Sequence, residues 1–437
     1  MKSNSKKVTE EKHEKNNLQF IFNDKKLKKN RKFRKYISNN FLAKSDFKVT
    51  NKVMKHYNAI DKNDDDKQNI KKTRNPGVDL LRIISMYTII FNHLLYSGIG
   101  GYKIFPKLKR PLFLWHSFTA WHNNAFMLIS GIVGYKTNKY SNLLYLWLIV
   151  FFYSVGLYKY SLYFKKNYII KHQIDIEYYP IIFQRYWYFT AYFGMYLFLP
   201  IINRGIQYLT KYEFTLVIIT TLSLFVLWQD YKNPRGDVFL MSGGNSMIWL
   251  LIYYLPGAYI GKYRVDYFGI KKYIYCFICL FIFSFSSYIF FKAFMGESFL
   301  VIGKFKIKLP LIILKMVNEN YNSLFKVIQS ISICLFFLQI NYNKYLGKII
   351  CFLGPLVFGT YLIHTNKIIF VNALNTIFDK QPRDSTLNSI LSLLLIKSLK
   401  TLIICLIIEY FRHLLFTLLR IKKILIFLET KMKEKFS

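Results

Sequence analysis

The sequence has few acidic residues and few cysteines, and none of its segments resembles a cleavable leader. Its 437 residues hold 23 Asp and Glu against 62 Lys and Arg. The five cysteines all fall inside or at the edge of apolar segments, so neither a disulfide framework nor a metal site in a loop is expected. The first apolar run begins only near Val78 and is long enough to span a bilayer, so it predicts a first membrane anchor instead of a signal peptide.

What the chain does contain is apolar sequence. It is 53% hydrophobic and 19% aromatic, a composition that a single soluble domain of this length does not have. The sequence predicts an all-α, polytopic transmembrane helical bundle of about ten spans. The expected spans lie near 78–100, 113–135, 142–160, 186–203, 212–230, 246–262, 272–292, 323–340, 347–364 and 388–411.

Outside the bundle, the excess positive charge lies in the tails and loops. Residues 1–75 form a Lys- and Asn-rich segment that we expect to be disordered, and 421–437 form a basic C-terminal tail on a membrane domain of 76–420. The run KKLKKNRKFRK at 25–35 can hold the first tail near anionic lipid. Nucleic-acid binding by this run stays an alternative, but nothing that reads bases accompanies it. The distribution of Lys and Arg among the loops predicts that both termini are cytoplasmic.

The first span carries an arginine and a histidine at membrane depth, where both are costly. Ten residues separate Arg82 from His93, so both fall on one face of a helix and ~16 Å apart along it. Asp79 precedes Arg82 at the i, i+3 spacing, where its carboxylate can pair with the guanidinium. The alternative is an arginine that reaches the headgroups and a histidine that ends the helix.

Three other histidines are expected at the same non-cytoplasmic level as His93. His116 and His122 begin the second span, and His364 ends the ninth. Zinc is the alternative use of such a cluster, but no helical pair of His ligands at metal-binding spacing accompanies it. The sequence therefore predicts no metal site.

Several segments together resemble the integral membrane acyltransferase-3 family. The first is VDLLRIISMYTIIFNHLL, with Arg, ten residues and His, followed by NNAFMLISGIVGYK at 123–136. Similar later blocks are RYWYFTAYFGMYLFLPIIN (185–203), GGNSMIWLLIYYLPGAYIGKY (243–263), YNSLFKVIQSISICLFF (321–337), FGTYLIHTN (358–366) and EYFRHLLF (409–416). Their order and spacing are closest to members that decorate bacterial surface polysaccharides.

The resemblance implies an O-acyltransferase that moves an acyl group, usually acetyl, from cytoplasmic acyl-CoA to a carbohydrate or glycolipid hydroxyl. Acyl-CoA would be a co-substrate, and no permanently bound cofactor is expected. The other partners implied are membrane lipids and the acceptor, without nucleic acid. The membrane is either a plasma membrane or an endomembrane.

The same resemblance assigns roles to residues. Arg82, oriented by Asp79, would meet the donor phosphates, and His93 would be the general base. Further donor contacts are expected from Lys136, Lys139 and Arg412. Acceptor contacts are expected from Tyr361, His364 and Trp187.

Some of these roles have competing interpretations. Lys136 and Lys139 stand where the family tends to carry paired arginines, and they are also typical of ordinary cytoplasmic loop charge. Arg412, at i, i+3 from Glu409, is equally consistent with a structural clamp. Trp187 and Tyr361 can belong to an aromatic belt.

A protein of another class also fits the buried ionisable residues. A transporter or flippase for a lipid-linked or small anionic molecule would use them to line a wet cavity. Such proteins often have repeated halves, and we find no convincing internal repeat in this chain.

Overall fold

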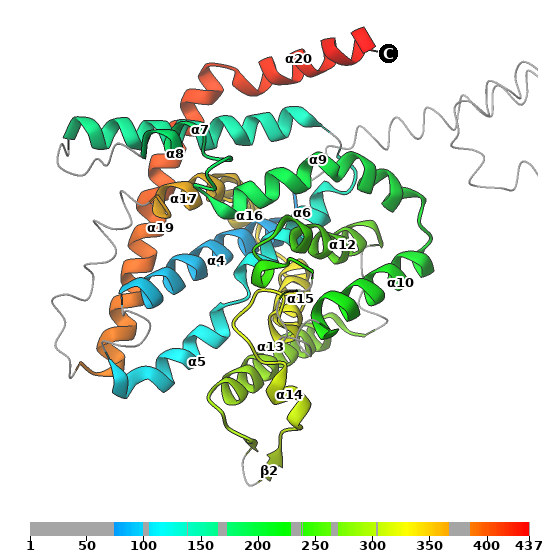
Figure 1. Ribbon diagram of the computed structural model, residues 1–437, viewed down its shortest axis with the longest axis vertical. Helices are drawn as coiled ribbons and strands as arrows, with labels where there is room; N and C mark the ends of the chain where they lie inside the picture. Colours follow the sequence, from blue (N-terminus) through cyan, green and yellow to red (C-terminus); the bar gives the residue numbers. More distant parts are fainter. Residues whose placement is uncertain are drawn as a thin grey trace, which may run out of the picture. The chain divides into compact units, whose positions relative to one another are not determined.

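The computed structural model describes residues 74–98, 105–137, 139–164, 173–228, 237, 239–263, 270–302, 305–366 and 385–436. This part of the chain is almost entirely helical (Figure 1). Its α-helices are α4 (Pro76–His93), α5 (Lys109–Thr119), α6 (His122–Gly134), α7 (Tyr140–Phe164), α8 (Gln173–Tyr178), α9 (Trp187–Tyr208), α10 (Lys211–Leu222), α12 (Met247–Tyr263), α13 (Lys272–Phe294), α14 (Leu311–Lys315), α15 (Leu324–Gln339), α16 (Lys344–Leu353), α17 (Val357–His364), α19 (Leu387–Leu418) and α20 (Ile421–Phe436). The expected tail of 1–75 lies outside the described residues, apart from its last two.

Short elements join or extend these helices. One antiparallel hairpin, β1 (Phe299–Ile302) with β2 (Phe305–Lys308), follows α13. The remaining elements are the 3-10 turns Pro106–Leu108, Ser242–Gly244 and Gly354–Leu356 and the π-helical turns Leu94–Gly98 and Ser223–Trp228.

Six helical segments of the described chain are long and apolar enough to cross a membrane. They are Pro76–Tyr96, Tyr140–Tyr163, Lys211–Trp228, Lys272–Phe294, Lys344–His364 and Leu387–Leu418. The chain is therefore a multi-pass helical membrane protein, as the sequence predicted. The total of about ten spans stays a prediction, because the other expected spans are shorter or more polar than this requirement.

The second expected span differs most from its prediction. The structure divides it into α5 and α6 at Ala120 and Trp121, so that two short helices replace one long one. The ninth span is likewise built from α16 and α17, joined by the 3-10 turn Gly354–Leu356. Pro355 in this turn has no amide hydrogen to donate to a continuous α-helix, and its position explains the change in geometry.

Helix α4 is the structural centre of the site described below. It begins at Pro76, after Asn75, whose side-chain oxygen accepts a hydrogen bond from the Gly77 amide at 2.8 Å. A side-chain cap followed by proline is a strong helix start. The helix contacts α5, α6, α15, α16, α17 and α19 (Figure 1), and most of its residues are buried. Such a helix can present different side chains to several neighbours at once.

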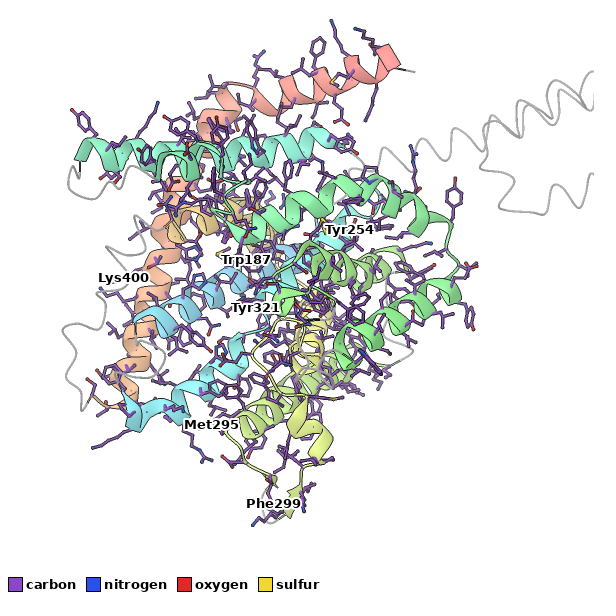
Figure 2. The ribbon with its side chains drawn as sticks, in the orientation of Figure 1. Trp187, Tyr254, Met295, Phe299, Tyr321 and Lys400 are labelled. Atoms are coloured by element: carbon purple, nitrogen blue, oxygen red, sulfur yellow. The ribbon has the colours of Figure 1, made fainter. Side chains whose placement is uncertain are left out.

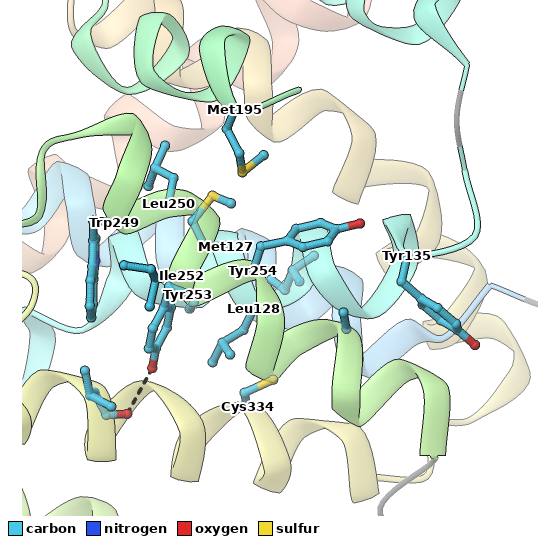
Figure 3. Packing of buried hydrophobic residues seen from close by; sticks show 14 of the residues in the cluster. Met127, Leu128, Tyr135, Met195, Trp249, Leu250, Ile252, Tyr253, Tyr254 and Cys334 are labelled. Carbon is cyan, nitrogen blue, oxygen red and sulfur yellow. Dashed lines mark hydrogen bonds between the residues drawn. The ribbon is translucent and has the colours of Figure 1, made fainter. Parts of the chain in front are cut away.

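Glycines bring α6 and α12 together. A Cβ atom at Gly131 of α6 would lie 2.3 Å from the carbonyl oxygen of Tyr254, and one at Gly257 of α12 would lie 2.2 Å from that of Leu128. Small residues allow this close approach between membrane helices. Figure 3 shows the aromatic and aliphatic packing beside this contact, where the Tyr253 hydroxyl donates to the Val327 carbonyl of α15 at 3.0 Å.

Helix α19 continues without a break through two lysines that interrupt its apolar sequence. Lys397 and Lys400 are both exposed, and Figure 2 labels Lys400 on this helix. The helix has 32 residues and is therefore ~48 Å long, well beyond the ~30 Å thickness of a hydrocarbon core. The part of the helix before Thr401, which carries both lysines, can therefore extend past the membrane.

The C-terminal segment of 421–437, expected as a basic tail, contains a regular helix. Helix α20 contacts the start of α7, where the backbone amides of Tyr140 and Ser141 donate to the Glu429 carboxylate at 3.2 and 3.0 Å. Most other side chains of α20 are exposed. The contact anchors the end of the chain to a candidate membrane span.

Candidate active site

One stripe of α4 forms a wall of a cavity of about 540 Å³. The stripe consists of Arg82, Met86, Ile89 and His93, at spacings of four, three and four residues. These spacings keep the side chains on one helix face. The cavity therefore has a guanidinium and an imidazole on the same wall, separated along the helix axis by ~16 Å. Its volume is typical of a site for a small molecule or cofactor.

The rest of the wall comes from segments far apart in the sequence. Helices α6, α7 and α9, the turn before α9, the turn before α15, and the junction of α16 with α17 all contribute. Their lining residues are Asn123, Phe126, Ser130, Leu146, Arg185, Tyr186, Trp187, Tyr188, Phe189, Tyr192, Tyr321, Gly354, Pro355, Val357, Phe358, Tyr361 and Thr365. Aromatic side chains dominate this wall.

At the arginine end, Asp79 fixes the guanidinium. Its Oδ1 lies 2.5 Å from Nη1 of Arg82, and the aspartate is completely buried whereas 21% of the arginine side chain is exposed. A Cβ atom at Gly354 would lie only 2.4 Å from the same oxygen. The absence of a side chain at Gly354 therefore makes room for the carboxylate beneath the cavity wall. The expected Asp79–Arg82 pair is present, although Asp79 itself does not line the cavity.

At the other end, His93 is in contact with His364. Nδ1 of His93 lies 3.3 Å from Nε2 of His364, with ring centroids 5.3 Å apart. Nδ1 of His364 lies 2.8 Å from the Thr360 carbonyl oxygen. His364 is fully buried and does not line the cavity. The structure thus places it behind His93, and gives no contact for the acceptor-binding role that the sequence suggested.

The two other residues expected to bind the acceptor do line the cavity. The Trp187 ring stacks on Tyr321, with centroids 6.1 Å apart and planes 16° apart. Figure 2 labels both residues. The Tyr361 ring makes edge-to-face contacts with the rings of Tyr186 and Tyr188, with centroids 6.0 and 6.3 Å apart. The cavity therefore has flat apolar faces near the His93 end, which suit the face of a sugar ring.

Sequence reasoning missed a second guanidinium on the wall. Arg185 is only 4% exposed in its side chain and pairs with Glu177 at 2.7 Å. It also donates to the Asn366 side-chain oxygen at 3.1 Å, and its buried Nε has no hydrogen-bond partner in the described part of the chain. The sequence feature that could have indicated it is its position: Arg185 is a charged residue at the start of the aromatic-rich segment RYWYFTAYFGMYLFLPIIN.

The remaining predicted donor contacts lie elsewhere. Lys136 and Lys139 are exposed and do not line the cavity. Arg412 is 4% exposed, pairs with Glu409, and donates to the Tyr145 hydroxyl at 3.3 Å, also away from the cavity wall. Of the four cations expected to meet the donor, the structure places only Arg82 on the cavity wall.

The histidines do not form a metal centre in the described residues. No group of three or more His, Cys, Asp or Glu side chains there has the arrangement to hold a metal ion. His116 is buried and hydrogen-bonded to Asn92 and Tyr96, each at 2.9 Å. Its ring is engaged within the protein. His122 contacts two residues of the cavity wall: its Nδ1 lies 3.1 Å from Oδ1 of Asn123, and its ring centroid lies 6.1 Å from that of Tyr321.

Comparison with known proteins gives one match. Residues 75–410 match a family model described as an acyltransferase domain. This range contains every residue of the cavity wall. No curated protein and no solved structure gives a significant match to the chain.

Proposed function

Because the chain belongs to the acyltransferase-3 family, we propose that it transfers an acyl group, acetyl in the first instance, from acyl-CoA to a hydroxyl of a carbohydrate or glycolipid. His93 is the general base of this reaction, and Arg82 binds the donor phosphates. The acceptor lies against the aromatic part of the cavity wall.

The observation that carries this proposal is the shared wall. The spacing of Arg82 and His93 places them on one face of α4, and the structure turns this face toward a cavity that both residues line. A cation fixed by Asp79 suits a phosphate, because a guanidinium presents several N–H donors in one plane. A pantetheine arm that follows the stripe over Met86 and Ile89 would carry the thioester toward His93.

At the His93 end the chemistry is an acyl transfer. The imidazole takes the proton of the acceptor hydroxyl while the oxygen attacks the thioester carbonyl carbon. The carbon–sulfur bond of the tetrahedral intermediate then breaks, and the CoA thiolate takes the proton back from the imidazolium. The products are an ester and free CoA. A base in this position contributes roughly 10²–10⁴-fold to the rate.

The acceptor and the orientation follow from the same arrangement. Trp187, Tyr321 and Tyr361 offer faces on which a sugar ring can stack. We place the Arg82 end toward the cytoplasm, where acyl-CoA is made, with both termini on that side. The acceptor then reaches His93 from the opposite half of the membrane. The family membership favours this enzymatic function over a transporter.

The test supplies labelled acetyl-CoA to membranes that contain the wild type, His93→Ala, Arg82→Ala or His413→Ala. His413, on α19, does not line the cavity and serves as the matched control. We expect label in carbohydrate from the wild type and the control, about 10²–10⁴-fold less from His93→Ala, and a KM for acetyl-CoA raised about 10- to 100-fold in Arg82→Ala. Equal labelling by wild type and His93→Ala would refute the assigned base. If the wild type transferred no acyl group from any acyl-CoA, the proposed reaction would be refuted.

A further inference from the structure

We propose that His364 is a positioning residue that sets the tautomer of His93, so that Nε2 of His93 is the nitrogen that takes the proton. This inference rests on the proposed function, since it gives His93 the same role as base. It replaces the acceptor contact that the sequence suggested for His364.

The argument begins at a backbone carbonyl. The Thr360 oxygen lies 2.8 Å from Nδ1 of His364, and a carbonyl oxygen can only accept a hydrogen bond. Nδ1 of His364 must therefore carry a hydrogen. Both residues are completely buried on α17, so water does not compete for this hydrogen bond.

The next step fixes the other nitrogen of His364. Charging this fully buried ring would take an imidazolium out of water, which is costly, so the ring is neutral. A neutral imidazole with its hydrogen on Nδ1 has a lone pair on Nε2. Nε2 of His364 is thus a hydrogen-bond acceptor, and it lies 3.3 Å from Nδ1 of His93.

The hydrogen on His93 follows from that acceptor. Nδ1 of His93 donates to His364, and the neutral His93 ring then has its lone pair on Nε2. When Nε2 takes the acceptor's proton, the resulting imidazolium still donates through Nδ1 to the lone pair of His364. The contact therefore favours the charged form that appears during the reaction, without a proton leaving His93 through His364.

The two rings come from different helices, which makes the contact a matter of tertiary packing. His93 ends α4 and His364 ends α17, 271 residues apart in sequence. Leu362 and Ile363, the two residues before His364, are buried and hold the end of α17 in place beside His93. A ring that orients another in this way acts as the orienting carboxylate does in serine hydrolases, but without a negative charge.

The experiment replaces His364 by Leu and by Gln. Leucine fills a similar space without hydrogen bonds, whereas a glutamine amide can donate to Thr360 and accept from His93. We expect His364→Leu to lower kcat about 10- to 100-fold, the usual effect of removing a group that orients a functional side chain. KM for acetyl-CoA should change less than about twofold, and His364→Gln should restore most of the lost rate.

A second pair of variants separates positioning from general damage to the fold. In a His93→Ala background, His364→Leu should cause no further loss, because a residue that acts only through His93 has nothing left to orient. Thermal unfolding of each variant in detergent shows whether it is folded.

Three results would overturn the proposal: a wild-type kcat in His364→Leu, an equal loss in the His93→Ala background, or a raised KM for the carbohydrate with unchanged kcat. If His93→Ala is as active as the wild type, the proposed base fails instead. A defect in His93→Ala with none in His364→Leu leaves the proposed function intact and removes only this inference.

Discussion

Two arginine–carboxylate pairs of the same sequence spacing have different surroundings in this protein. Asp79 with Arg82 and Glu409 with Arg412 are both i, i+3 pairs on candidate membrane spans. The side chain of Arg82 is 21% exposed and lines the cavity, whereas that of Arg412 is 3% exposed and does not. Spacing brings each pair together, and packing by other helices decides what the pair can do.

The hydrogen bonds around Glu409 describe a clamp between helices. Its Oε2 accepts from the Tyr153 hydroxyl of α7 at 2.6 Å and from Nε of Arg412 at 3.1 Å. The guanidinium also lies 4.7 Å from the Phe416 ring centroid and donates to Tyr145 of α7. These contacts tie α19 to α7, and neither residue of the pair lines the cavity. Of the two alternatives for Arg412, the geometry therefore favours the clamp.

The position of each carboxylate along its helix also differs. Asp79 lies in the first turn of α4, where the helix dipole stabilises a negative charge. Glu409 lies far from either end of α19 and has no such support. We therefore expect removal of its arginine to destabilise the fold more at Glu409 than at Asp79.

The largest effect should come from removing the buried guanidinium. Arg412→Ala should lower the free energy of unfolding by about 3–5 kcal/mol, because it leaves the Glu409 carboxylate buried without its partner. Arg82→Ala should cost at least about 1 kcal/mol less, since the helix N-terminus still stabilises Asp79. The measurement is equilibrium unfolding of both variants in detergent micelles.

A double variant provides the control. Replacing both charges, as Glu409→Gln with Arg412→Met, should recover much of the lost stability, because removal of a whole buried pair is often nearly neutral. The contrast between the pairs would be wrong if Arg82→Ala destabilised the protein as much as Arg412→Ala.

This contrast also shows what the sequence could predict. Local spacing was sufficient for the Asp79–Arg82 pair and for the common face of Arg82 and His93, because helix geometry alone determines both. The pattern of apolar runs, together with the family blocks, was sufficient for a multi-pass helical protein. These features depend on residues close together in the chain.

Other features depend on contacts between distant segments, and the sequence could not supply them. The place of His364 behind His93 requires α17 to pack on α4, and the hydrogen bond from Arg185 to Asn366 requires the end of α17 to approach the start of α9. The second expected span is divided at Ala120 and Trp121, where the sequence has no proline or glycine that would predict a helix break. Apolar content alone therefore predicted one helix where the structure has two.

Two glycines allow a sharper form of the comparison, with a smaller expected effect. A Cβ at Gly354 would lie 2.4 Å from the Asp79 carboxylate, and one at Gly359 would lie 2.0 Å from that of Glu409. Either Gly→Ala change must displace a carboxylate, and we expect each to cost about 1–3 kcal/mol of stability, as overpacking does. Only Gly354→Ala should also raise KM for acetyl-CoA, because Asp79 orients the guanidinium on the cavity wall.

The control for both is Gly156→Ala on α7, where a Cβ would meet nothing within 4 Å. It should leave unfolding and KM close to their wild-type values or stabilise the protein slightly. A rise in KM for acetyl-CoA that is as large in Gly359→Ala as in Gly354→Ala would contradict the assignment of one pair to the donor and the other to structure.

The smallest effect belongs to a third pair, which extends the comparison to the surface. Lys433 and Glu429 lie 2.7 Å apart on α20, with 61% and 13% of their side chains exposed. Partial burial alone would raise the pKa of Glu429, but hydrogen bonds from Lys433 and Ser141 hold that pKa at about 2. Because the pKa is lower than in the unfolded chain, the stabilisation is present above about pH 4.5 and is lost as the pH falls toward 2.

Glu429→Gln at pH 7 should loosen α20 from α7 by no more than about 1 kcal/mol, the usual limit for an exposed pair. Hydrogen exchange of the α20 amides then rises at most about fivefold, whereas Glu434→Gln, with the same change in charge on the same helix, should leave it nearly unchanged. An equal rise in both variants would mean that net charge, and not the contact of Glu429 with the start of α7, holds the last helix in place.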